Sequence, residues 1–429
     1  MLREFLAGNG NIDPAKLASA AGLPDDPEMV SQLMQQLQNA MNASGEGVNW
    51  GLALEQAKAL AARSTVVSLP AERSQLEQAF HVAALWLDEV TYLSELTATP
   101  RLMSRSEWVA ASMSVWTQLA EPVATSIADS LAEVLRDQAP EEMSGMMEGA
   151  SKLMRNVGGT LFAMQLGQVV GQLSTEVVSG GDVGIPLLDE QQAALLPQNV
   201  AAFGAGLDIP IDQVQLYLAV RELAHARLFR HAKWLRLQLL SSITDFARGI
   251  RIDTDRLEAL AEDFDPARPE ELRDAMTSGA LIPPKSDEQL VALARLETML
   301  ALIEGWVDVV TADASSRLPR VDAMAETVKR RRASGGPAES AFATLVGLEL
   351  RPRRLREAAQ MWRTVTDAVG AEKRDELWSQ PDLIPTSADI DNPDGLLARM
   401  SGAPAPDDMD QAIEDLLNDT TDDRPHEEN

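Results

Sequence analysis

Apolar residues recur at three- to four-residue spacing along most of this 429-residue chain. That spacing places them on one face of an α-helix, whereas a β-strand requires strict alternation, which is hard to find here. The helix-favouring residues Leu, Ala, Glu, Gln, Arg and Met are also abundant. The sequence therefore predicts an all-α fold, with helices over residues 50–63, 71–96, 105–136 and 142–178.

Composition divides the chain into three parts. Residues 401–429 hold ten acidic side chains and one arginine, so we expect an acidic, disordered tail. Before it we expect an N-terminal helical segment over residues 1–45 and one large helical domain over residues 46–400. The whole chain carries a net charge of −29, which repels the phosphates of nucleic acids and anionic membranes. Neither is therefore an expected partner.

Cysteine is absent, which excludes disulfides and thiolate metal ligands. No stretch approaches the roughly 18 uninterrupted apolar residues of a membrane span, and the N-terminus lacks the apolar core of a signal peptide. We therefore expect a cytoplasmic protein without a membrane span.

Gly167 and Gly171 form a GxxxG pattern, but glutamines interrupt it, so it predicts close packing of two soluble helices.

Residues 221–225 read Arg-Glu-Leu-Ala-His, one substitution away from the HExxH signature of a zinc peptidase helix. Residues four apart share one helix face, so two histidines at the first and last positions can bind one ion. The glutamate between them polarises the attacking water. Glu222 and His225 are present, but Arg221 is not a ligand because its guanidinium stays protonated and has no lone pair. The motif predicts a general-base position at Glu222 and one ligand position at His225.

A zinc site also needs a third protein ligand. His231 has the spacing of the third histidine in HExxHxxGxxH, but Leu228 replaces the glycine that lets the chain turn back. We therefore expect His231 to point elsewhere. Glu304 and Asp308 lie four residues apart on an apolar helical segment. Because buried carboxylates need partners, we expect this pair to face the helix that bears RELAH, which begins near Pro210 after a linker-like stretch over 187–210.

Two clusters concentrate positive charge in this acidic chain, at residues 329–332 (KRRR) and 351–356 (RPRRLR). One interpretation is a site for an anion or a partner. The other, which we favour, is a solvated face that pairs with the acidic surface of the same protein.

Six stretches carry a resemblance to a known group of proteins. They are GVNWGLALEQAKALAAR (47–63), GQVVGQLSTEVVSGGDVGIPLL (167–188), YLAVRELAHARLFRHAKWLRLQLLSSITDFARGIRID (217–253), IEGWVDVV (303–310), GLELRPRRLREAAQMWR (347–363) and RDELWSQPDLIPTSADIDNP (374–393). Together they resemble the zincin-like metallopeptidases, a family common in actinobacteria whose members are also named as hydrolases. The resemblance covers nearly the whole chain and implies a largely helical fold with a zincin-type site. On the matching positions, Arg221 replaces the first zinc ligand, Glu222 is the general base, His225 the second ligand and Glu304 the third.

The function we favour is that of a protein that has lost its zinc site. Arg221 then forms an ion pair with Glu304 or Asp308, with His225 beside them, and no cofactor is bound. Such a chain would be an inactive binding or regulatory protein for an unknown protein or peptide partner. Arg221→His is then expected to create an affinity for zinc, because it restores two imidazoles four residues apart.

The alternative is an active zinc-dependent hydrolase with Glu222 as its general base. Zinc would then be held by His225 and Glu304 with one further group, either His231 or Asp308. A plainer third interpretation is a helical scaffold in which RELAH is only a salt-bridged helix surface.

Overall fold

A computed structural model describes residues 48–137, 159–160, 162–189, 192–248, 285–333, 337–348 and 354–401. The fold is predominantly helical, as the sequence predicts. Within those ranges the strands are β1 (Arg101–Leu102) and β2 (Ala194–Leu195), which pair in parallel. The expected N-terminal segment over 1–45 and nearly all of the tail over 401–429 lie outside the described residues. The division into these parts stays a prediction.

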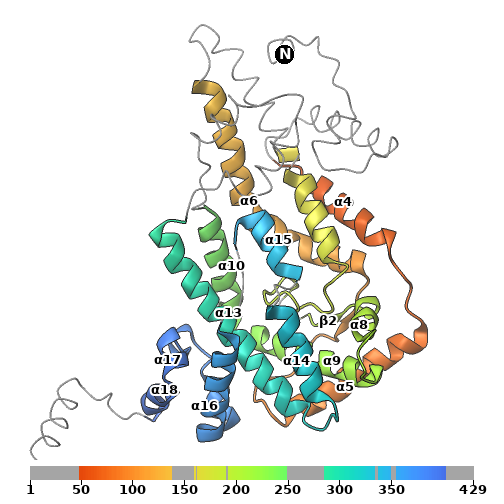
Figure 1. Cartoon of the computed structure of the whole chain (residues 1–429), viewed down its shortest axis with the longest axis vertical. Helices are drawn as coiled ribbons and strands as arrows, with labels where there is room; N and C mark the ends of the chain where they lie inside the picture. The colour runs from red at the N-terminus through yellow and green to blue at the C-terminus, as the bar shows by residue number, and fades with distance from the viewer. Residues whose placement is uncertain are drawn as a thin grey trace, which may run out of the picture.

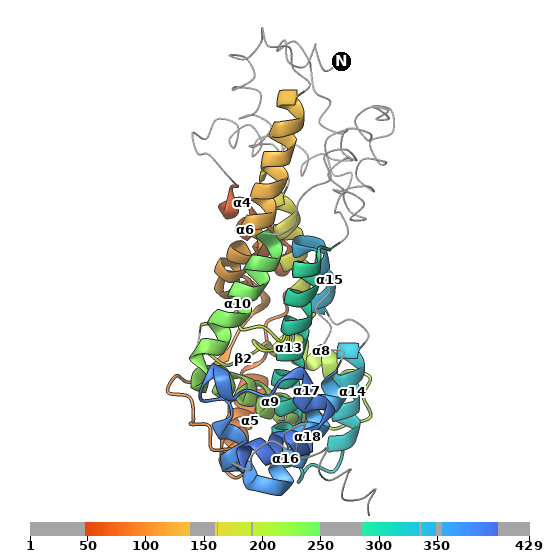
Figure 2. The ribbon, with the colours of Figure 1, turned by 90° about the vertical axis from the view of Figure 1, so that its left-hand side faces the viewer.

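The helices follow one another along the chain and pack into a single bundle-like arrangement (Figure 1). Their bounds are α4 (Trp50–Arg63), α5 (Pro70–Asp88), α6 (Arg105–Asp137), α8 (Pro197–Gly204), α9 (Ile211–His231), α10 (Lys233–Arg248), α13 (Asp287–Ala314), α14 (Val321–Ala333), α15 (Pro337–Val346), α16 (Leu355–Glu376), the short 3-10 turn η2 (Pro381–Leu383), α17 (Ser387–Asp391) and α18 (Pro393–Met400). Residues 162–173 are also helical. The helices α16, α17 and α18 pack against one another at one end of the molecule (Figure 2).

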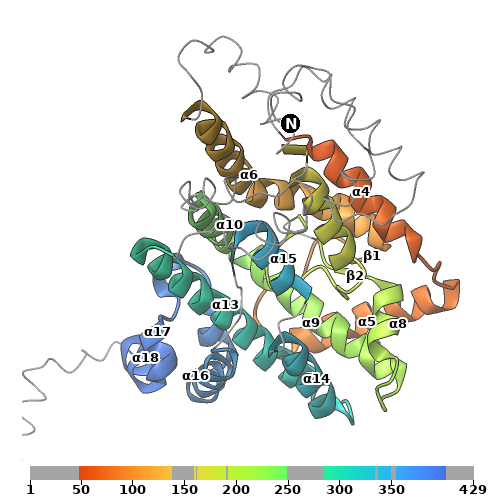
Figure 3. The ribbon, with the colours of Figure 1, turned by 45° about the horizontal axis from the view of Figure 1, so that its top comes forward.

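The helix α9 lies at the centre of this arrangement, packed against α5, α8, α13 and α14 (Figure 3). It is buried on nearly all sides, although its sequence carries charged and polar residues in its middle turns. Val214, Leu218 and Leu228 of this helix are in the core. Because even the polar side chains of its middle turns are buried, each of them must find a partner inside the protein.

The GxxxG glycines bring two helices into close contact. A Cβ atom added to Gly167 would lie 2.7 Å from the backbone oxygen of Ala53 in α4, and one added to Gly171 would lie 2.9 Å from Leu60. Only a glycine fits at such a separation, so the predicted close packing of two helices is confirmed. Among the described helices, none combines the length and the apolar character that crossing a membrane requires.

Three of the predicted boundaries are wrong. The helix expected over 142–178 ends at residue 173, and its first part over 142–158 lies outside the described residues. The helix expected to reach residue 96 ends at Asp88, because the carboxylate of Asp375 accepts hydrogen bonds from the Thr91 hydroxyl and the Tyr92 N–H and holds that stretch outside the helix. The stretch expected to be linker-like, 187–210, instead contains β2 and α8. Its alanines and leucines at 193–196 are fully buried, so they form part of the core.

A small three-segment sheet borders α9. The segment 178–180 lies on one side of β2, where Gly180 N–H donates to the Ala194 carbonyl over 2.9 Å. On the other side, Arg101 N–H donates to the Ala193 carbonyl, also over 2.9 Å. This sheet fixes the loop that follows residue 180, and that loop faces the RELAH turns of α9.

Candidate functional site

The carboxylate of Glu304 on α13 is the centre of the site. Arg221 and His225, one helical turn apart on α9, contact its two oxygens. The Arg221 guanidinium donates to Oε2, and His225 Nε2 lies 3.0 Å from Oε1. The exposed fractions are 8% for Arg221, 3% for His225 and 1% for Glu304, so the group is buried. The ion pair expected between Arg221 and Glu304 or Asp308 is therefore present, and it is made with Glu304.

A second arginine, which the sequence did not single out, also contacts Glu304. Arg332 Nη1 lies 2.6 Å from Glu304 Oε1, and its side chain is 12% exposed. It comes from the last turn of α14, inside the basic cluster 329–332. The basic cluster is the sequence signal for a cation in this region, but the sequence does not show which of its four cations reaches Glu304.

The surrounding charges keep Glu304 ionised. Burial alone would raise its pKa, but Arg332, Arg221 and His225 together hold the pKa of this carboxyl well below its usual range. A carboxylate with two guanidinium partners and an imidazole is satisfied without any further cation.

The other cations of the cluster pair with acidic side chains of the same protein. Asp308, the second carboxylate on the α13 face, pairs with Lys329 over 2.9 Å and not with Arg221. Arg331 pairs with Asp182 over 2.8 Å, and Arg330 reaches Glu326 over 3.4 Å. The predicted pairing with the protein's own acids is therefore present at residues 329–332. The predicted solvated face is wrong for Lys329, Arg331 and Arg332, which are partly buried, and Arg330 is the exposed member. In the second cluster, Arg354 donates to Asp391.

His231 stays apart from this group. It is exposed and is the last residue of α9. Burial of part of its ring lowers the pKa of His231, and the charge of Asp375 opposes this shift. Leu228 continues the helix in the core, which is why the chain does not turn back towards the site.

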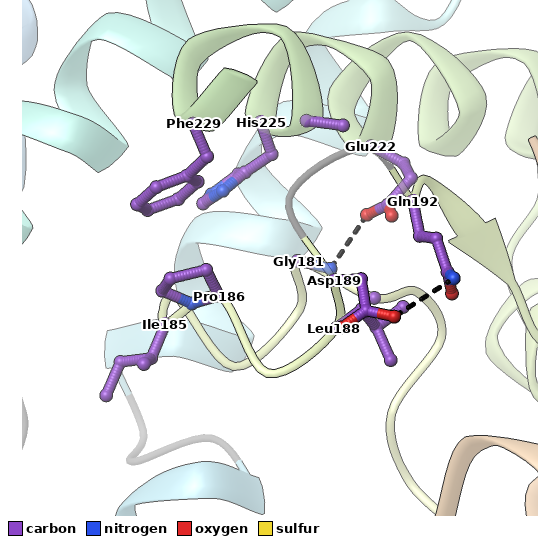
Figure 4. A pocket seen from close by; sticks show the side chains of 11 residues that line it. Gly181, Ile185, Pro186, Leu188, Asp189, Gln192, Glu222, His225 and Phe229 are labelled. Carbon is purple, nitrogen blue, oxygen red and sulfur yellow. Dashed lines mark hydrogen bonds between the residues drawn. The ribbon is translucent and has the colours of Figure 1, made fainter. Parts of the chain in front are cut away.

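Glu222, also on α9, is held by backbone donors. Its Oε2 accepts the Gly181 N–H over 2.8 Å (Figure 4). Its Oε1 accepts the Ala194 N–H, also over 2.8 Å. Burial raises the pKa of this carboxyl, and those two hydrogen bonds oppose the rise. Glu222 therefore joins the centre of α9 to β2 and to the neighbouring loop. The sequence did not predict this role, because its partners are backbone groups.

A small cleft opens beside these residues (Figure 4). His225 and Phe229 project into it from α9, with their rings stacked 5.8 Å apart. The opposite wall comes from the loop after residue 180, including Ile185, Pro186 and Leu188. Gly181 lies so close that an added Cβ would be 3.0 Å from His225 Cγ. The cleft thus combines apolar walls with an imidazole and a carboxylate at its base.

The comparisons with known proteins agree with this architecture. The family model for zincin-like metallopeptidases matches residues 48–397. The chain belongs to this family. It is also similar to a solved structure from Chloroflexus aurantiacus described as a "putative hydrolase with a novel fold", at 19% identity and a TM-score of 0.56, over 82% of this chain and 99% of that one. At this identity the likeness shows a shared fold. A search of curated proteins gave no match.

Zinc is the metal that membership of the zincin-like family implies, and the donor set here does not fit it. Catalytic zinc needs three protein ligands with lone pairs and an open position. Around Glu304 the donors are one carboxylate and His225, and both oxygens of the carboxylate already bind guanidinium groups. Across the described ranges, three or more His, Asp or Glu side chains nowhere come together in a way that could hold a metal ion. In this member of the zincin-like family, two arginines stand where a dication would be expected.

Proposed function

We propose that this chain is a metal-free member of the zincin-like family that binds a protein or peptide instead of hydrolysing one. The observation that carries the proposal is the occupancy of Glu304: Arg221, Arg332 and His225 use both of its oxygens. A dication entering this group would be repelled by two fixed positive charges and would gain few ligands.

The cleft supports the binding part of the proposal. Ligand pockets are mostly apolar and carry a few fixed polar groups, and here Ile185, Pro186 and Phe229 supply the apolar walls. His225 is held in place by Glu304, so its ring is oriented before any ligand arrives. An apolar side chain of an extended peptide fits this chemistry.

The alternative, a zinc-dependent hydrolase with Glu222 as general base, requires more rearrangement. Glu222 would have to leave the two backbone donors whose hydrogen bonds it accepts here, and buried donors left unpaired are costly. Glu304 would have to exchange its arginines for the metal.

The test is the metal content of the full chain purified without chelator, together with titration of zinc by calorimetry. We expect no stoichiometric zinc and no chelator-sensitive peptidase activity on a mixed peptide library. The same library should show binding of peptides with apolar residues, and Phe229→Glu should weaken it. Stoichiometric zinc that is lost in His225→Ala would overturn the proposal in favour of the hydrolase.

A further inference from the structure

The two arginines at Glu304 come from different helices. Arg221 stands at the first ligand position of α9, whereas Arg332 comes from the end of α14 and contacts the oxygen that His225 also contacts. Replacing Arg221 therefore leaves one guanidinium in place. The effect of Arg332 on a metal ion has to be considered on its own.

Three cations at the end of α14 bind three separate acids. Lys329 pairs with Asp308, Arg331 with Asp182 and Arg332 with Glu304. Each bond holds the same helical turn, so the position of Arg332 does not depend on Glu304 alone.

Further contacts fix Arg332 where it lies. Its Nη2 donates to the Asp182 backbone carbonyl over 3.0 Å. Asp182 is itself held, because its Oδ2 accepts the Val178 N–H over 2.9 Å. A Cβ added to Gly184, which has a φ of +81°, would lie 3.2 Å from both Arg332 Nη1 and Glu304 Oε1. The backbone at Gly184 therefore packs directly against the contact between Arg332 and Glu304.

We propose that Arg332 is a second barrier to metal binding, so that Glu304 becomes available to zinc only when both arginines have been removed. The inference rests on the proposed metal-free function. It adds a condition to the zinc affinity that the sequence predicts for Arg221→His, because Arg332 remains on Glu304 in that variant. A guanidinium within hydrogen-bond distance of the ligand oxygen opposes a dication at close range, and a charge at this separation changes affinity by about 100-fold or more.

The test compares zinc binding by three variants of the full chain. These are Arg221→His alone, Arg221→His with Arg332→Gln, and Arg221→His with Arg331→Gln. The last is a matched control, because Arg331 belongs to the same helical turn but pairs with Asp182. The probe is zinc alone, measured by calorimetry and by the zinc-dependent shift of the unfolding midpoint, which also works for a destabilised variant.

We expect the double variant Arg221→His with Arg332→Gln to bind zinc about 100-fold or more tightly than Arg221→His alone. The control, Arg221→His with Arg331→Gln, should have the same zinc affinity as Arg221→His alone. Equal zinc affinity in Arg221→His alone and in Arg221→His with Arg332→Gln would overturn the role of Arg332. The role of Arg332 would also be overturned if zinc neither bound nor stabilised the double variant Arg221→His with Arg332→Gln, or if this double variant did not fold in the presence of zinc. Stoichiometric zinc in the parent chain would instead refute the proposed function, so the two failures are distinct.

Discussion

Arg332 and His225 contact the same oxygen of Glu304, although they lie on different helices. In a zinc site one dication would link a histidine and a glutamate from two helices. Here a guanidinium from α14 and another from α9 provide the positive charge. Both belong to side chains of the protein, so they cannot dissociate as a metal ion can. Because an isolated buried carboxylate is costly, the fold depends on these arginines for its stability.

Arg221→Ala is expected to lower the free energy of unfolding by about 3 kcal/mol, measured by urea denaturation. Breaking a buried ion pair costs about 3–5 kcal/mol, and the lower end applies because Arg332 stays on Glu304. Arg330→Ala is the control: this arginine is 78% exposed and pairs with Glu326, so its loss should cost less than about 0.5 kcal/mol. Equal losses in the two variants would contradict a buried role for Arg221.

Gly167→Ala is expected to destabilise the protein by about 1–3 kcal/mol, because the added Cβ would lie 2.7 Å from a backbone oxygen that has little room to move. Alanine favours helix by about 1 kcal/mol over glycine, so packing must outweigh that gain. Gly51→Ala in α4 is the matched control, since its added Cβ meets one atom, Asn49 Oδ1, at 3.3 Å. Its unfolding free energy should stay unchanged or rise by up to about 1 kcal/mol. A stable Gly167→Ala variant would show that the two helices can separate.

The contact between Arg221 and Glu304 was predictable from the sequence for two reasons. Both residues lie in long, clearly periodic helices, so the face of each could be inferred. Their charges also require each other once the segments are buried, and His225 follows because it lies one turn from Arg221 on the same face.

Other parts of the site were not predictable. The four cations at 329–332 look alike in sequence, and only the placement of α14 decides that Arg332 turns inward while Arg330 faces solvent. The partners of Glu222 are the backbone N–H groups of Gly181 and Ala194, and any residue type supplies such a group. The strand β2 has two residues, which is too short for an alternating pattern to be seen.

Glu222→Gln tests whether this residue joins the sheet to α9. One carboxylate oxygen becomes an NH₂ group that faces a backbone N–H, so one buried donor loses its acceptor. We expect a loss of about 1–3 kcal/mol in unfolding free energy by urea denaturation, with faster hydrogen exchange at Gly181 or Ala194. Glu326→Gln is the control, because that side chain is 48% exposed, and its effect should be within about 0.5 kcal/mol. An unchanged stability in Glu222→Gln would leave this residue free for another role.

Tyr217, one turn before Arg221 on α9, provides a test of burial by pH. Burial raises the pKa of this phenol to about 12, while the charge of Arg221 acts in the opposite direction. The chain has two tyrosines, and Tyr92 is 68% exposed, so Tyr92→Phe leaves Tyr217 as the single phenol. Because the folded state favours the protonated form, this contribution to stability is complete below about pH 10 and is lost as the pH rises through about 12. Phenolate absorbance of native Tyr92→Phe should therefore appear near pH 12, and that of the urea-unfolded chain near about pH 10, with circular dichroism confirming that the native sample stays folded. A native midpoint near that of the unfolded chain would show that water reaches the centre of α9, and the buried arginine site beside it would then be open as well.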